Sequence, residues 1–269
     1  MHKRISLHQV CFIQESNAAF LQACRTIGIG NAVLVTPKLQ EPGDVEAIAR
    51  ESLQGGPRIS GLNHVVATFP DLAADGGQAR EGLLAAIDAA QALGADTLYL
   101  LTGGRGPLGW EATAERFAAL VEPCLDAARA GGVSLLIENA SALYADVHIA
   151  HGLADTIRLA EQAGVGVCID LFHCWAEAGL EDLLRRAVPR CGLVQVSDYV
   201  LGDRSLPARA VPGDGAIPLE RLLGTLLEAG YEGMFDIELL GPRIEAEGNA
   251  AAAARAAEHL SAMLAALGA

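Results

Sequence analysis

The sequence has little positive charge for its size. Its 269 residues carry 19 lysines and arginines against 33 aspartates and glutamates, a net charge of −14. Nucleic acids and anionic membranes are themselves negatively charged and would be repelled by such a chain. We therefore expect neither a nucleic acid nor a membrane as partner.

Long apolar runs are also missing. No uninterrupted run approaches the ~20 residues needed to span a bilayer. The first residues, "MHKRISLHQVCFIQES", are basic and then apolar, as in a signal peptide, but the apolar part is short and is broken by His8, Gln9 and Gln14. No small-residue cleavage site follows it. We interpret this stretch as a first strand and expect a cytoplasmic protein.

Motifs for redox pairs and nucleotides are absent as well. The six cysteines stand at positions 11, 24, 124, 168, 174 and 191, without CxxC spacing, and we expect them to be reduced and mostly buried. No GxGxxG pattern follows the first strand. The glycine-rich "TGGRGP" at 102–107 lacks the lysine and the hydroxyl residue of a P-loop. These absences argue against a dinucleotide or nucleoside triphosphate site.

Short β-like runs alternate with longer amphipathic stretches rich in alanine and leucine. Eight strands and eight helices in alternation predict a (β/α)8 TIM barrel forming a single domain over residues 1–269. A doubly wound α/β sheet is the second choice, weakened by the missing glycine motif. The expected strands cover 5–13, 31–35, 59–69, 96–101, 133–140, 165–172, 192–200 and 233–240.

Four of these strands, the fifth to the eighth, each carry a polar residue near the end. They are Glu138, Asp170, Gln195 and Glu238, each set among apolar neighbours. Strand ends in a barrel meet at its carboxyl-terminal mouth, where three buried carboxylates would repel one another. A divalent cation removes this conflict, and an oxygen-rich set suits Mn²⁺, Mg²⁺ or Co²⁺. Taken singly, each residue also fits a cap or an ion pair, and Asp170 fits a helix N-cap.

An unusually long loop at 201–218 follows the seventh strand and is expected to lie over the mouth. Its Arg204 and Arg209 can bind a substrate carboxylate or phosphate, or simply pair with surface acids. His8 and His64, on the first and third strands, fit either the pocket wall or the core. Asp198 fits either an orienting residue beside the site or a helix cap.

The segments "IEN", "IDLFH", "VQVSD", "PGDG" and "DIEL", in this order, carry a family resemblance. The chain resembles the xylose isomerase-like barrel superfamily, and within it the sugar phosphate isomerase/epimerase family, over nearly its whole length. The resemblance implies one divalent cation bound by Glu138, Asp170, the residue at 195 and Glu238, with His173 near the substrate. The family commonly has histidine where this chain has Gln195, a variant found in 3-dehydroshikimate dehydratase-like barrels.

The function expected from these residues is metal-assisted proton transfer beside a carbonyl, with Glu138 and Glu238 as the catalytic pair. The substrate would be a small keto-sugar or related polyol, handled by an isomerase or epimerase of carbohydrate metabolism. The alternative is a dehydratase (a lyase) of the 3-dehydroshikimate or inosose dehydratase kind. An AP-endonuclease relative would need a basic face and more metal-binding histidines than the 7 in all found here. A sugar-binding barrel without catalysis and a homo-oligomeric state also stay open.

Overall fold

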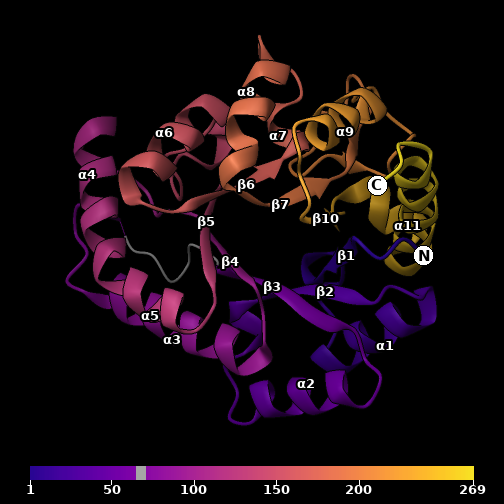
Figure 1. Cartoon of the computed structure of the whole chain (residues 1–269), viewed down its shortest axis with the longest axis horizontal. Coiled ribbons are helices and arrows are strands. Elements are labelled where there is room, and N and C mark those ends of the chain that lie inside the picture. Colours follow the sequence, from indigo (N-terminus) through magenta and orange to yellow (C-terminus); the bar gives the residue numbers. More distant parts are fainter. Residues whose placement is uncertain (65–70) are drawn as a thin grey trace.

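Parallel strands alternate with helices along the chain in this computed structural model, which describes residues 1–64 and 71–269 (Figure 1). Eight strands close into a barrel in the order β1-β10-β7-β6-β5-β4-β3-β2. This confirms the predicted (β/α)8 barrel. The barrel strands are β1 (Ile5–His8), β2 (Asn31–Val35), β3 (Arg58–His64), β4 (Thr97–Leu100), β5 (Ser134–Glu138), β6 (Gly166–Asp170), β7 (Cys191–Val196) and β10 (Met234–Ile237).

Helices form a ring around the strands, as Figure 1 shows. The helices are α1 (Asn17–Ile27), α2 (Asp44–Leu53), α3 (Gln78–Leu93), α4 (Trp110–Val121), α5 (Leu125–Ala130), α6 (Leu153–Ala163), α7 (Leu171–Cys174), α8 (Leu180–Ala187), α9 (Leu219–Glu228), α10 (Pro242–Glu247) and α11 (Asn249–Ala266). The alanine-rich end of the chain is the closing helix, as expected, and it packs against α1. Within the described ranges, no helix combines the length and apolarity needed to cross a membrane.

Several predicted strands are too long. The first ends at His8 and continues as a 3-10 helix over Gln9–Phe12, because the His8 side chain accepts a hydrogen bond from the amide of Val10. The expected strand at 192–200 is two elements: β7 ends at Val196, and β8 (Asp198–Tyr199) leaves the barrel to pair with β9 (Arg209–Ala210). Residues 65–69 of the expected third strand lie outside the described residues.

Alternate residues of the strands point into the barrel and fill it with a layer of side chains. This interior layer consists of Val33, Tyr99, Leu136, Cys168 and Leu193. A larger core lies between the strands and the helices. Because side chains alternate with period two, the next inward residues of β5, β6 and β7 are Glu138, Asp170 and Gln195. The barrel geometry therefore brings these polar residues together above the apolar layer.

Candidate active site at the carboxyl end of the barrel

Three carboxyl groups and an amide lie at the carboxyl ends of neighbouring strands. Glu138 ends β5, Asp170 ends β6, Gln195 lies opposite Asp170 on β7, and Glu238 follows β10 directly. Glu138 and Glu238 are 6% and 8% exposed, and the other two are fully buried. The four residues that the sequence singled out thus come from adjacent strands and form one cluster.

A guanidinium lies within this cluster. Arg209, only 3% exposed, projects from the short strand β9 into the mouth of the barrel. Its Nη2 donates to Oδ2 of Asp170 at 2.6 Å and lies 3.1 Å from Oε1 of Glu238. Its Nη1 lies 3.3 Å from Oδ1 of Asp170 and donates to Oγ of Ser197 at 3.0 Å. The carbon at the centre of the guanidinium stands 4.7 Å from the ring centroid of Phe172.

The three carboxyl groups differ in the direction in which their pKa values are shifted. Burial alone would raise the pKa of Asp170, but Arg209, His173 and the Phe172 amide together outweigh burial, and the pKa is lowered. Burial raises the pKa of Glu238 to about 7, with Arg209 acting in the opposite direction. Burial, followed by the charge of Glu238, raises the pKa of Glu138 well above its usual range. The carboxyl groups therefore differ in their affinity for protons.

Glu138 differs from the other two in its contacts. In the part of the chain that the structure describes, no hydrogen-bond donor pairs with its carboxyl oxygens, whereas Asp170 and Glu238 both have donors. One ligand atom each from Glu138, Asp170 and His173 lie within 4.8 Å of one another, close enough to share a metal ion. The donor set is rich in carboxylate oxygen, which suits a divalent cation.

The amide of Gln195 connects the carboxylates to the far side of the barrel. Its Nε2 donates to Oε2 of Glu238 and, at 3.1 Å, to the hydroxyl of Tyr99. Its Oε1 accepts from the thiol of Cys168 at 3.3 Å. In this orientation the amide oxygen faces away from the carboxylates. The predicted role of Gln195 as a metal ligand therefore requires the amide to rotate, and it stays a prediction.

His8 lies at the other end of this connection. Its Nδ1 accepts from the amide of Val10 at 3.0 Å, so neutral His8 carries its proton on Nε2 and donates to the hydroxyl of Tyr99 at 2.6 Å. Burial lowers the pKa of His8 to about 3, which keeps the ring neutral. His8 is thus connected to Gln195 through the hydroxyl of Tyr99. The sequence did not single out Tyr99, because it lies in the apolar run of β4.

His173 stands beside the ion pair. Its Nε2 lies 3.5 Å from Oδ2 of Asp170 and 3.4 Å from Nη2 of Arg209, and its ring packs edge-on against Phe172 and Tyr144. Burial lowers the pKa of His173 to about 4. The predicted neighbourhood of His173 and the carboxylates is therefore present, and a role in substrate binding stays a prediction.

Asp170 also acts as a helix cap, which confirms that interpretation, while its role as a metal ligand stays a prediction. Its Oδ1 accepts from the amide of Phe172 at 2.9 Å and caps the short helix α7. Asn139 fixes the backbone at this point, because its side chain accepts from the Asp170 amide and donates to the Asp170 carbonyl, both at 2.9 Å. The signal for Asn139 was its place in the "IEN" segment, directly after Glu138.

Arg204 and His64, two further predicted residues, have other contacts. Arg204 is exposed, and its Nη1 donates to the hydroxyl of Tyr199 at 3.1 Å. His64 ends β3, is buried, and has Nδ1 3.2 Å from Oγ1 of Thr36. Arg204 is thus exposed, whereas Arg209, which was predicted together with it, is buried. Substrate binding by Arg204, His64 and His8 stays a prediction.

Asp198 holds the loop that carries Arg209. Its carboxylate accepts hydrogen bonds of 2.8 to 3.0 Å from four backbone amides, those of Tyr199, Gly213, Gly215 and Ile217. The "PGDG" turn is thereby tied to β8. Asp198 is a clamp for the long loop, a role that neither sequence-based interpretation described.

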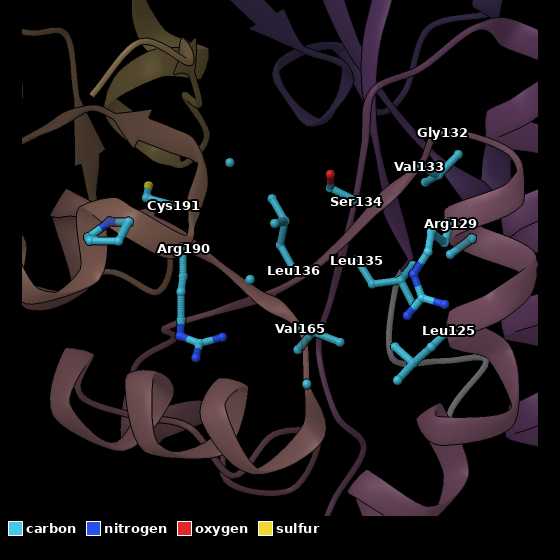
Figure 2. A pocket seen from close by; sticks show the side chains of 15 residues that line it. Leu125, Arg129, Gly132, Val133, Ser134, Leu135, Leu136, Val165, Arg190 and Cys191 are labelled. Carbon is cyan, nitrogen blue, oxygen red and sulfur yellow. The ribbon is translucent and has the colours of Figure 1, made fainter. Parts of the chain in front are cut away.

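A hollow of about 620 Å³ opens at the opposite end of the barrel. It is lined by the first residues of β5, β6 and β7 and by two arginines, Arg129 and Arg190 (Figure 2). No residue of the carboxylate cluster lines it. The hollow is therefore separate from the candidate active site.

Comparison with known proteins shows to which family the chain belongs. The family model described as xylose isomerase-like TIM barrel matches residues 21–263. The chain belongs to this family. A putative hydroxypyruvate isomerase from Streptomyces coelicolor is 29% identical over 217 residues, covering 74% of this chain and 75% of that protein.

Solved structures share the fold at lower identity. The IOLI protein with a binding zinc atom superposes with a TM-score of 0.82 at 16% identity, over 98% of this chain and 99% of the other. L-ribulose 3-epimerase gives a TM-score of 0.79 at 18% identity, over 99% of this chain and 96% of the other. At these identities the likeness concerns the barrel itself.

Proposed function

We propose that this protein is a divalent-metal-dependent isomerase or epimerase of a small keto-sugar or a related hydroxycarbonyl compound. The observation that carries the proposal is the buried cluster of Glu138, Asp170 and Glu238 at the carboxyl end of the barrel. Family membership and the similarity to a putative hydroxypyruvate isomerase and to a sugar epimerase support the same reaction class.

The residues present fit a cation. Glu138, Asp170 and Glu238 supply carboxylate oxygens, and Gln195 supplies an amide oxygen after rotation of its side chain. When Glu138, Asp170 and Glu238 are all deprotonated, the single buried guanidinium leaves an excess of negative charge that a divalent cation would balance. When bound there, the cation would act as a Lewis acid, polarising the substrate carbonyl and stabilising the developing negative charge. Mn²⁺, Mg²⁺ and Co²⁺ are the ions we propose.

Glu138 and Glu238 are the proposed proton-transfer pair. Glu138 ends β5 and Glu238 follows β10. Because β6 and β7 lie between these strands in the barrel, the two residues approach a substrate in the mouth from different sides. One carboxylate takes the proton from the carbon beside the carbonyl, and the other returns a proton to the adjacent carbon or to the opposite face. Glu138 is 6% exposed and has no hydrogen-bond donor among the described residues, so its oxygens are free to exchange a proton with the substrate.

Substrate contacts are proposed for the polar groups around this pair. His173 and Arg209 lie beside the carboxylates, where they can donate hydrogen bonds to substrate oxygens. His8, His64 and Arg204 are proposed as further contacts, His8 through Tyr99. The protein would act on this small molecule in the cytoplasm, alone or as a homo-oligomer.

The test is turnover of metal-stripped protein reloaded with Mn²⁺, Mg²⁺ or Co²⁺, using hydroxypyruvate and a panel of ketoses in D₂O followed by NMR. An isomerase or epimerase gives a product of unchanged formula that carries solvent deuterium at the reacting carbon. Replacing Glu138 or Glu238 by Gln should lower the rate by about 10² to 10⁴-fold. Exposed Glu122, changed to Gln, is the matched control.

A product that has lost water would assign the dehydratase reaction to the same site. If the protein shows no turnover and no deuterium exchange with any of the metals, the proposed function is contradicted. Equal rates in the Glu138 and Glu122 variants would contradict the assignment of the proton-transfer pair.

A further inference from the structure

The buried guanidinium of Arg209 lies on the oxygens that a metal ion would need. Both oxygens of Asp170 face it, at 2.6 and 3.3 Å, and so does Oε1 of Glu238, at 3.1 Å. The other oxygen of Glu238 faces the Gln195 amide. Every carboxyl oxygen of Asp170 and Glu238 therefore has a donor already.

A guanidinium and a divalent cation cannot use these oxygens in the same way at the same time. Both are positive, and in a buried site with low effective permittivity their repulsion is strong. The two terminal nitrogens of Arg209 each face one oxygen of the Asp170 carboxylate, so the guanidinium engages both of the atoms that a metal ion would use. Only the carboxylate of Glu138, among the three and within the described residues, is without a donor.

We propose that Arg209 is an internal counter-cation that competes with the divalent metal for Asp170 and Glu238, and that metal binding displaces its guanidinium. The inference rests on the metal site of the proposed function. Without metal, Arg209 pairs with Asp170 and Glu238 and offsets part of their charge. With metal, the guanidinium moves off Asp170 but stays at the mouth, because the Asp198 clamp holds its strand.

This role has a signature that separates it from a structural one. Removing the guanidinium takes away a competitor, so the metal should bind more tightly. It also leaves buried carboxylates unpaired, so the metal-free protein should be less stable. An arginine that merely holds the fold would lower stability without tightening metal binding, and one that orients Asp170 for the metal would weaken binding when removed.

The experiment measures Mn²⁺ affinity of metal-stripped protein by electron paramagnetic resonance of free Mn²⁺, so no turnover is needed. Arg209→Gln should tighten binding by at least about tenfold, or about 1.4 kcal/mol. Ser197→Ala removes only the hydroxyl that accepts from Nη1 of Arg209, and it should tighten binding by about threefold. It is the variant to use if Arg209→Gln does not fold. Arg243→Gln, at an exposed arginine, is the control with the same charge change and should match the wild type.

The outcomes separate this inference from the proposed function. Equal or weaker Mn²⁺ binding in Arg209→Gln and Ser197→Ala, with binding by the wild type intact, overturns the counter-cation role and leaves the metal site standing. Binding by Arg209→Gln but not by the wild type supports the competition and contradicts metal dependence of the native protein. No binding by any of them overturns both.

Discussion

The Asp198 clamp gives a prediction whose size follows from the structure. Asp198→Ala removes an acceptor of four backbone amides. A hydrogen bond to a charged group contributes about 1.5 to 3 kcal/mol. The total loss should be smaller than the sum, because Gly213 and Gly215 are exposed and water can reach their amides. We expect a loss of about 3 to 5 kcal/mol in the free energy of unfolding and a fall of about 10 °C in Tm.

Urea unfolding, followed by circular dichroism at 25 °C, measures this loss. Asp198→Asn keeps one acceptor oxygen and should lose roughly half as much. Asp126→Ala is the control, since Asp126 is exposed and pairs with exposed Arg129, and its effect should stay within about 0.5 kcal/mol. A loss below about 1 kcal/mol in Asp198→Ala would refute the clamp.

Three further predictions concern Gly215 in the long loop, Tyr99 inside the barrel and Arg255 on the surface. Gly215→Ala places a methyl group against the carboxylate of Asp198 and should lower the free energy of unfolding by about 1 to 3 kcal/mol, measured by urea unfolding; an unchanged midpoint would contradict it. Tyr99→Phe removes the hydroxyl that accepts from two buried side chains and should lower stability by about 1 to 3 kcal/mol, with a neutral result in thermal unfolding counting against that network. Arg255 lowers the pKa of Asp214 below 3.8, so the pair stabilises the fold above this pH and loses its contribution as the pH falls through the lowered pKa. Arg255→Gln should therefore be less stable than the wild type by about 0.5 to 1 kcal/mol at pH 7, and the gap should close in acid; a gap that widens in acid would contradict the pairing.

The order of strands and helices could be predicted from the sequence because local patterns determine it. Apolar runs such as 31–35 became β2 with the predicted bounds. Strand ends were less predictable where a side chain accepts a hydrogen bond from a backbone amide just after the strand. The His8 ring accepts from the amide of Val10 and stops β1, and Asp170 caps α7 and stops β6. Such captures depend on the side-chain conformation, which the apolar pattern does not encode.

The acidic residues of the candidate site were predictable from the sequence, whereas the buried position of Arg209 among them was not. Glu138, Asp170 and Glu238 stand at strand ends, and strand ends meet at one mouth of a barrel. Arg209 lies 39 residues after Asp170 in a loop, and only the pairing of β8 with β9 brings it inside. In the sequence it resembled Arg204, which the structure leaves exposed. The difference between them arises from tertiary structure alone.

Calorimetric titration of metal-stripped protein with Mn²⁺ tests the central claim most directly, with Asp170→Asn beside the wild type. We expect one site per chain in the wild type and its loss in Asp170→Asn, since this residue ends β6 at the centre of the cluster. The exposed Asp126→Asn control should bind as the wild type does. Undiminished binding in Asp170→Asn, or no binding by the wild type, would contradict a metal site at the mouth of this barrel.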